Sequence, residues 1–177
     1  MEELTIAFLS SVRFENDAVI RGAALITDVQ TKPLEFRVTA PVHPTNFQKT
    51  LYGDILTEHI LVELITIPLL KALSQKPDIV VVRDPLFLGA NERQDVPIVR
   101  VFKDGEARFT GNNKVEQLTS IGGKYEPILF ETSKSLEAKL PELRKQLSEV
   151  FSRRSLLEPF DRIETALQQV HTQKVGE

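Results

Sequence analysis

The sequence contains no cysteine and no tryptophan, and it has only two tyrosines and one methionine. Without cysteine, the protein cannot use disulfides, thiolate nucleophiles or cysteine-bound zinc. The lack of disulfides fits a reducing compartment, and we expect a cytoplasmic protein. A chain of 177 residues is long enough to bury a sizeable core without covalent cross-links.

Long apolar runs are missing as well. The most apolar stretch, residues 60–73, is interrupted by Glu63, Thr66, Pro68 and Lys71, so it falls short of the ~20 apolar residues of a membrane span. The first residues carry acids where a signal peptide needs positive charge. The net charge is −3 and the lysines and arginines are dispersed. Nucleic acid is therefore a conceivable partner that the overall charge does not support.

The most informative segment is residues 60–85. An apolar helical stretch leads through Lys76-Pro77-Asp78 into Ile79–Val82, a run of four apolar residues that ends at Arg83-Asp84-Pro85. An uninterrupted apolar run is typical of a strand that is buried on both faces of a sheet. Because sites in open α/β sheets lie at the carboxyl ends of strands, Arg83 and Asp84 are candidate binding residues.

Alternating apolar residues predict three antiparallel strands before this segment, and turn residues separate them. A helical pattern follows, and Gly53 and Pro68 make it compatible with one bent helix or two consecutive helices. Asp104-Gly105 predicts a hairpin, and a further strand comes later. The ranges are 5–12, 18–29 and 34–42 for the first strands, 97–102 and 107–110 for the hairpin, and 125–130 for the last strand.

The composition changes after Glu131, which divides the chain into an α/β core, residues 1–131, and a helical part, residues 132–177. Two amphipathic stripes in the second part predict two helices, and Pro141 and Pro159 mark helix starts. The apolar positions are Leu136, Leu140, Leu143, Leu147, Val150 and Phe151, then Phe160, Ile163, Leu167 and Val170. The stripes either pack on the core or form an interface, and we expect a homo-oligomer through these helices, with Leu167 in the contact.

Two further candidate binding residues lie in the helical stretch. His59 and Glu63 are four residues apart and share one helix face. Zinc proteases use His-Glu-x-x-His, which is absent here, so a structural His-Glu pair remains the alternative to a site. Arg83 and Asp84 have a similar alternative, because an ion pair or a turn-capping aspartate also fits that position. The pattern thus defines no metal site, and we expect no cofactor.

Part of the chain resembles endonuclease V, a family with the ribonuclease H-like fold. The resemblance covers residues 6–89 and rests on LYGDIL, VELITIPLLKAL and KPDIVVVRDP. It implies a mixed sheet in which carboxylates hold Mg²⁺ or Mn²⁺ against a phosphate. Glu63 would stand for the helix glutamate and Asp84 for the aspartate that ends the central strand. The first strand has no aspartate in residues 8–11, and Asp-Gly-His-Gly is replaced by Arg83-Asp84-Pro85-Leu86.

These observations favour an α/β domain of ribonuclease H-like type: a mixed sheet with three antiparallel N-terminal strands, a helix, a buried central strand and C-terminal helices. Because the acid of the first strand is missing, the leading interpretation is a non-catalytic binding or assembly module. The alternative is a divalent-metal-dependent nuclease or phosphoesterase that uses Glu63 and Asp84. The third possibility is an enzyme of another kind that acts on a small molecule.

Overall fold

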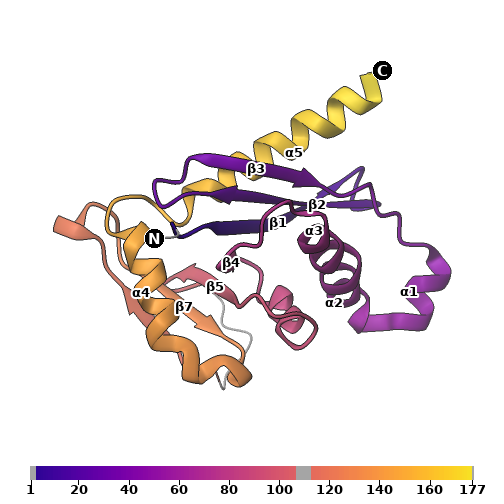
Figure 1. Cartoon of the computed structure of the whole chain (residues 1–177). Coiled ribbons are helices and arrows are strands. Elements are labelled where there is room, and N and C mark those ends of the chain that lie inside the picture. Colours follow the sequence, from indigo (N-terminus) through magenta and orange to yellow (C-terminus); the bar gives the residue numbers. More distant parts are fainter. Residues whose placement is uncertain (1–2, 107–112, 177) are drawn as a thin grey trace.

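The computed structural model describes residues 3–106 and 113–176. Its centre is a seven-stranded mixed sheet with the strand order β3-β2-β1-β4-β5-β7-β6 (Figure 1). The strands are β1 (Ile6–Phe14), β2 (Val19–Thr27), β3 (Pro33–Val38), β4 (Ile79–Val82), β5 (Ile98–Lys103), β6 (Glu116–Leu118) and β7 (Ile128–Thr132). The predicted fold class, a mixed ribonuclease H-like sheet with helices, is confirmed by this arrangement.

The first three strands form the predicted antiparallel meander. Ile6 of β1 pairs with Thr27 of β2, and Leu25 of β2 pairs with Phe36 of β3. The turn between β1 and β2 has positive φ angles at Glu15, Asn16 and Asp17, which is a conformation that asparagine and aspartate tolerate. Every residue of β2 is buried, because helices cover both faces of the sheet.

β4 is the predicted central strand. It lies between β1 and β5 and runs parallel to both, with Phe8 opposite Val81 and Val82 opposite Arg100. All four of its residues are fully buried, as the apolar run predicted. The N-terminal half of the predicted hairpin is β5, but its second half, residues 107–110, lies outside the described residues. Among the described strands, β5 pairs with β4 on one side and with β7 on the other.

One face of the sheet is covered by a helical run that is interrupted in two ways. α1 (Asn46–Tyr52) leads into a short turn, η1 (Gly53–Ile55), and a continuous run follows: α2 (Leu56–His59), η2 (Ile60–Thr66) and α3 (Ile67–Ala72). The bend occurs at Gly53, whose φ is 56°. η2 is a π-helix, and its wider turns change the hydrogen-bonding register just before Pro68, which lacks a donor.

The other face is covered by α4 (Leu140–Phe151) and α5 (Glu158–Gly176), with η4 (Ile121–Gly123) and η5 (Lys134–Lys139) nearby. α5 contacts β1 and β2, and Phe8 meets Phe160 edge-on with ring centroids 5.6 Å apart. Leu167 is fully buried. The expectation that Leu167 forms an oligomer contact is therefore corrected, because the chain's own sheet already covers this stripe.

None of the helices in residues 3–106 and 113–176 is long and apolar enough to cross a membrane.

Candidate functional site

The carboxyl end of β4 carries charge, as the sequence predicted, but these charges are engaged in local structure. Arg83 forms an ion pair with Glu106, with Nη2 and Oε1 2.6 Å apart. The Asp84 carboxylate accepts a hydrogen bond of 2.9 Å from the Leu86 amide and thereby starts η3 (Pro85–Glu92). The structure thus gives both residues their alternative roles, an ion pair and a turn-capping aspartate.

A buried ion pair lies beside this strand end. Arg100 Nη1 and Glu131 Oε1 are 3.4 Å apart, and their side chains are only 4% and 2% exposed. Arg100 also donates to the Arg83 carbonyl oxygen at 3.3 Å and lies 4.1 Å from the centre of the Phe102 ring. These contacts join β4, β5 and β7 and fix the position of the Arg83 backbone.

The Glu106 carboxyl, which pairs with Arg83, has a lowered pKa. Burial raises the pKa of its carboxyl, but the hydrogen bond from the Lys103 amide and the Arg83 guanidinium outweigh burial, so the pKa lies below its ordinary value. Glu106 is therefore a charged partner at neutral pH. This leaves Arg83 poorly placed to bind a further anion.

β1, on one side of β4, offers no acid at this end, because residues 8–11 are Phe-Leu-Ser-Ser. Leu9 of β1 is fully buried and belongs to the same apolar cluster as Val82 and Phe87. Phe87 lies in η3, so the segment that follows β4 packs down onto an apolar surface. The strand end is consequently filled by side chains.

The other two predicted residues lie together in a cavity beside the helical run. His59 and Glu63 line a cavity of about 330 Å³, and Glu58 and Arg93 line it too. Glu63 forms an ion pair with Arg93, and the His59 ring stacks on Tyr52, with ring centroids 4.6 Å apart. The structure thus brings His59 and Glu63 together, whereas Arg83 and Asp84 do not line this cavity.

Sequence reasoning missed Glu58 and Arg93 as site residues. An ideal Cβ at Gly89 would lie 2.6 Å from Glu58 Oε1, so a glycine at this position leaves the space that the Glu58 carboxylate occupies. Among the described residues, no hydrogen bond or ion pair of the Glu58 carboxylate is found. Local sequence patterns could not reveal that Glu58 lies against Gly89, because the two residues are 31 positions apart, with β4 between them.

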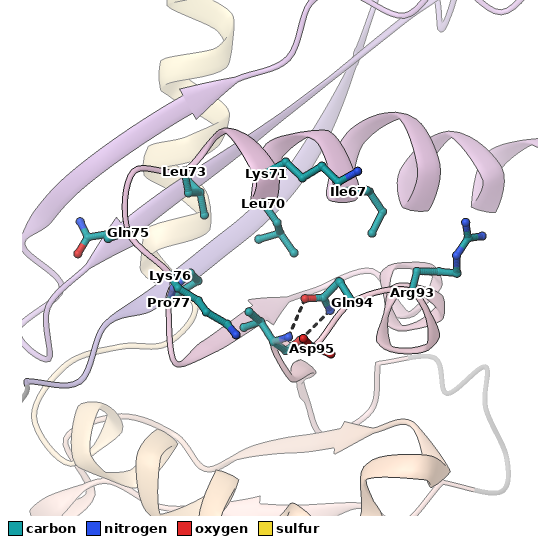
Figure 2. A pocket seen from close by; sticks show the side chains of 11 residues that line it. Ile67, Leu70, Lys71, Leu73, Gln75, Lys76, Pro77, Arg93, Gln94 and Asp95 are labelled. Atoms are coloured by element: carbon teal, nitrogen blue, oxygen red, sulfur yellow. Dashed lines mark hydrogen bonds between the residues drawn. The ribbon is translucent and has the colours of Figure 1, made fainter.

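A second cavity of about 430 Å³ continues from Arg93 toward the end of α3 (Figure 2). It is basic, since Lys71, Lys76 and Arg93 line it with a single acid, Asp95. The loop on its other wall is held by the Gln94 side chain, which donates to and accepts from the Val96 backbone, each at 2.7 Å.

Because both cavities share Arg93, we treat them as one feature. We call it the helix groove, defined by Glu58, His59, Glu63, Arg93, Lys71 and Lys76. Its acidic end lies beside α2 and its basic end beside α3. Glu58 and Lys71 are 13 positions apart on one helical run, which corresponds to about 20 Å along the axis.

The endonuclease V resemblance implies a divalent metal, and the side chains were tested against that expectation. Among residues 3–106 and 113–176, no group of three or more His, Asp or Glu side chains could hold a metal ion together. Glu63 is paired with Arg93, Asp84 caps η3 and Leu9 is apolar. These residues do not fit the acid-rich ligand set that hard cations require.

The fold is similar to that of several solved endonuclease V structures. The enzyme from Streptomyces avermitilis superposes with a TM-score of 0.63 over 97% of this chain and 82% of that chain, at 11% identity. The catalytic domain of human endonuclease V gives 0.57 over 98% and 85%, at 12% identity. The Ciona intestinalis enzyme, bound to a 23-mer DNA containing an inosine followed by a ribo-adenosine, gives 0.57 over 96% and 87%, at 10% identity.

No protein-family model and no curated protein matches the chain. The structural likeness confirms the endonuclease V resemblance and extends it from residues 6–89 to nearly the whole chain. It also overturns the leading functional interpretation. The prediction of a non-catalytic binding or assembly module is wrong, because the similar structures are nucleases and favour the nuclease alternative.

Proposed function

We propose that this protein acts on nucleic acid as a nuclease of the endonuclease V type and binds the strand along the helix groove. The observation that carries the proposal is the division of charge in this groove, within a fold that is similar to endonuclease V. Two carboxylates and a histidine line one end, and lysines line the other. A phosphodiester substrate needs both, cations for its phosphates and acid–base groups for its cleavage.

Lys71 and Lys76 neutralise backbone phosphates at the basic end. Both are exposed, and neither forms an ion pair with another described residue. Arg93 stands at the junction of the two cavities, where its guanidinium contacts a phosphate that lies between the two ends. Arg93 is paired with Glu63, but its side chain is 57% exposed, compared with 34% for Arg83, so its guanidinium remains accessible to a phosphate.

Glu58 is the proposed general base. Its carboxylate lies against Gly89 and lines the cavity together with His59. The carboxylate accepts a proton from the water that attacks the phosphorus, the P–O bond to the leaving oxygen breaks, and the neighbouring imidazole donates a proton to that oxygen. Since the described residues do not fit a metal centre, no step of this proposal passes through a metal ion.

The experiment is a cleavage assay on single-stranded DNA, duplex DNA and RNA, each with and without inosine, in Mn²⁺, in Mg²⁺ and in excess chelator. We expect the wild-type protein to cleave at least one substrate in excess chelator as well as in Mn²⁺ or Mg²⁺, and cleavage that requires the metal would contradict the acid–base mechanism. Glu58→Gln should reduce the rate by about 10²–10⁴-fold, as expected for loss of a general base. Glu149→Gln, an exposed carboxylate on α4, is the matched control.

Two results would overturn the proposal. One is the absence of cleavage above background on every substrate and metal condition. The other is cleavage that is equally fast in Glu58→Gln and Glu149→Gln, which would remove Glu58 from the reaction. Cleavage that is lost in Asp84→Asn but kept in Glu58→Gln would return the active site to the end of β4.

We also propose that the protein is cytoplasmic and forms a homodimer. The absence of cysteine supports the location. For the dimer, the stripe of α5 is already covered, whereas Phe47, Leu51 and Ile55 follow one another at a spacing of four and are 72%, 65% and 63% exposed. Light scattering of the wild type and of Leu51→Glu tests this, and a monomeric wild type at high micromolar concentration contradicts it.

A further inference from the structure

Another basic cavity, separate from both cavities of the helix groove, lies on the other face of the sheet. Its volume is about 530 Å³, and it is lined by Gln30, Ile121, Lys124, Ser152, Arg153 and Arg154. Three of these six residues are cations and none is an acid. In a protein with a net charge of −3, such a local excess of positive charge favours an anionic ligand.

The cations are held by neutral oxygen atoms. Arg154 Nε donates to Gln30 Oε1 at 3.4 Å, and Lys124 Nζ donates to the Arg153 carbonyl oxygen at 3.4 Å. Among the described residues, neither they nor Arg153 form an ion pair with a carboxylate. Arginines close by in the chain differ, since Arg144 pairs with Glu116 and Arg162 pairs with Glu158.

The backbone brings these cations together. η4 contacts the end of α4 through a hydrogen bond of 3.3 Å from the Ile121 amide to the Ser152 carbonyl oxygen. Gly122 and Gly123 have φ angles of 65° and 67°, which glycine adopts without strain. The turn therefore returns the chain so that Lys124 faces the segment after α4. The turn thereby places a lysine beside this segment.

The cavity and the basic end of the helix groove lie at the same end of the strands, where β2 finishes and β1 and β4 begin. Gln30 follows β2, whose Thr27 pairs with Ile6 at the start of β1. Lys76 precedes β4, whose Ile79 pairs with the same Ile6. Only β1 separates β2 from β4, so the two strands are about 10 Å apart.

We infer that the cavity of Lys124, Arg153 and Arg154 binds phosphates of the nucleic-acid strand after the strand leaves the helix groove at Lys76. The inference rests on the proposed function for the identity of the polyanion. A strand that leaves the groove passes over the start of β1 and meets this cavity on the opposite face. The two basic cavities then form one continuous binding site around this end of the strands, and this cavity takes no part in cleavage.

The test is the salt dependence of binding, measured by fluorescence anisotropy with a labelled single-stranded oligothymidylate. Each phosphate contact contributes about 0.7 to the slope of log K against log salt for single strands. Arg153→Gln/Arg154→Gln should therefore lower the slope by about 1.4, and Lys124→Gln alone by about 0.7. The control, Lys139→Gln/Lys145→Gln, removes two exposed cations from η5 and α4 that lie outside the cavity and should leave the slope unchanged.

Oligonucleotide length separates this site from the helix groove. A short strand of roughly 4 nucleotides, at the lower end of single-strand site sizes, should fill only the groove and bind the double variant as it binds the wild type. A strand of roughly 16 nucleotides should discriminate between them. Inorganic phosphate serves as a competitor. If it displaces the short and the long strand equally well, the cavity binds free phosphate, and the proposed continuous binding site for the strand is refuted.

The outcomes are distinct from those of the cleavage assay. Equal slopes for Arg153→Gln/Arg154→Gln and Lys139→Gln/Lys145→Gln would refute the second site even if Glu58→Gln abolishes cleavage. A lowered slope together with no cleavage on any substrate would keep the phosphate site and refute the nuclease. Unchanged thermal unfolding of each variant is the accompanying check, and the single Lys124→Gln exchange serves if the double variant unfolds.

Discussion

Replacing Glu131 by alanine removes the carboxylate that pairs with the buried guanidinium of Arg100. The two side chains are 2% and 4% exposed, so water cannot replace the lost partner. Removing one member of a buried ion pair costs about 3–5 kcal/mol. Arg100 keeps its hydrogen bond to the Arg83 carbonyl oxygen and its contact with the Phe102 ring, and we therefore expect the lower end, about 3 kcal/mol.

Urea unfolding at neutral pH measures this loss, because the shift of the midpoint at constant slope gives the change in free energy of unfolding. The comparison is Glu116→Ala, which breaks the Arg144–Glu116 pair. That pair is 3.2 Å long, and its side chains are 47% and 21% exposed. We expect at most about 1 kcal/mol there, since solvent screens an exposed pair.

A double exchange tests the physical cause. Arg100→Met/Glu131→Leu replaces both charges by apolar side chains and should recover most of the stability that Glu131→Ala loses, because both charges of the pair are removed together. If Glu131→Ala is no less stable than Glu116→Ala, the guanidinium of Arg100 is hydrated in solution, and the reasoning from burial is refuted.

Two further predictions concern contacts that hold the sheet to its helices. Gly22→Ala should destabilise the protein by about 1–3 kcal/mol in the same urea assay, because the new Cβ would lie 2.2 Å from Ile65 Cγ2. The clash is confirmed if Gly22→Ala costs less in an Ile65→Ala background than in the wild type, and an unchanged midpoint for the single exchange would contradict it. Glu35→Gln should destabilise at neutral pH only. Hydrogen bonds from the Ser74 amide and Arg37 lower the pKa of Glu35 below 4.5, so its stabilisation is present above that value and lost as the pH falls through the lowered pKa; a difference from wild type that is independent of pH would refute this.

The parts of the fold that the sequence predicted are those with a strong local pattern. Ile79–Val82 form a buried strand because an apolar run of this length fits only the middle of a covered sheet. The turn at residues 15–17 and the start of α5 near Pro159 follow from residues whose backbone preferences are strong. Helix bounds were less certain, since a π-helix such as η2 has no sequence signal separate from that of an α-helix.

Amphipathic stripes predicted helices but not what covers them. The Leu143 and Leu167 stripes are equally compatible with a sheet or with a second subunit, because both bury apolar area. The structure buries both residues under the chain's own sheet. The choice between these interpretations depends on how many strands the sheet has and how large a face it presents to the helices. Both depend on long-range strand pairing, which local patterns do not encode.

The candidate site was half predictable for a similar reason. His59 and Glu63 were found because a spacing of four residues places them on one helix face. Arg93 was not, because it reaches the helix from a loop 30 residues later. The sequence also directed attention to Arg83 and Asp84, which do lie at a strand end, but whose partners Glu106 and the Leu86 amide belong to segments with no recognisable pattern.

The apolar part of β1 that lies beside the end of β4 explains why the candidate site lies beside the helix. A carboxylate at Leu9 would be buried among apolar side chains, at a cost of several kcal/mol unless it were paired. With leucine there, Phe87 of η3 packs into the same cluster and is 1% exposed, which closes the strand end. Gly89 of η3 then lies against Glu58, and Arg93, which ends η3, pairs with Glu63. The charged groups of the helix groove therefore lie on the helix side, whereas Leu9, Val82 and Phe87 fill the space between β1 and the segment after β4.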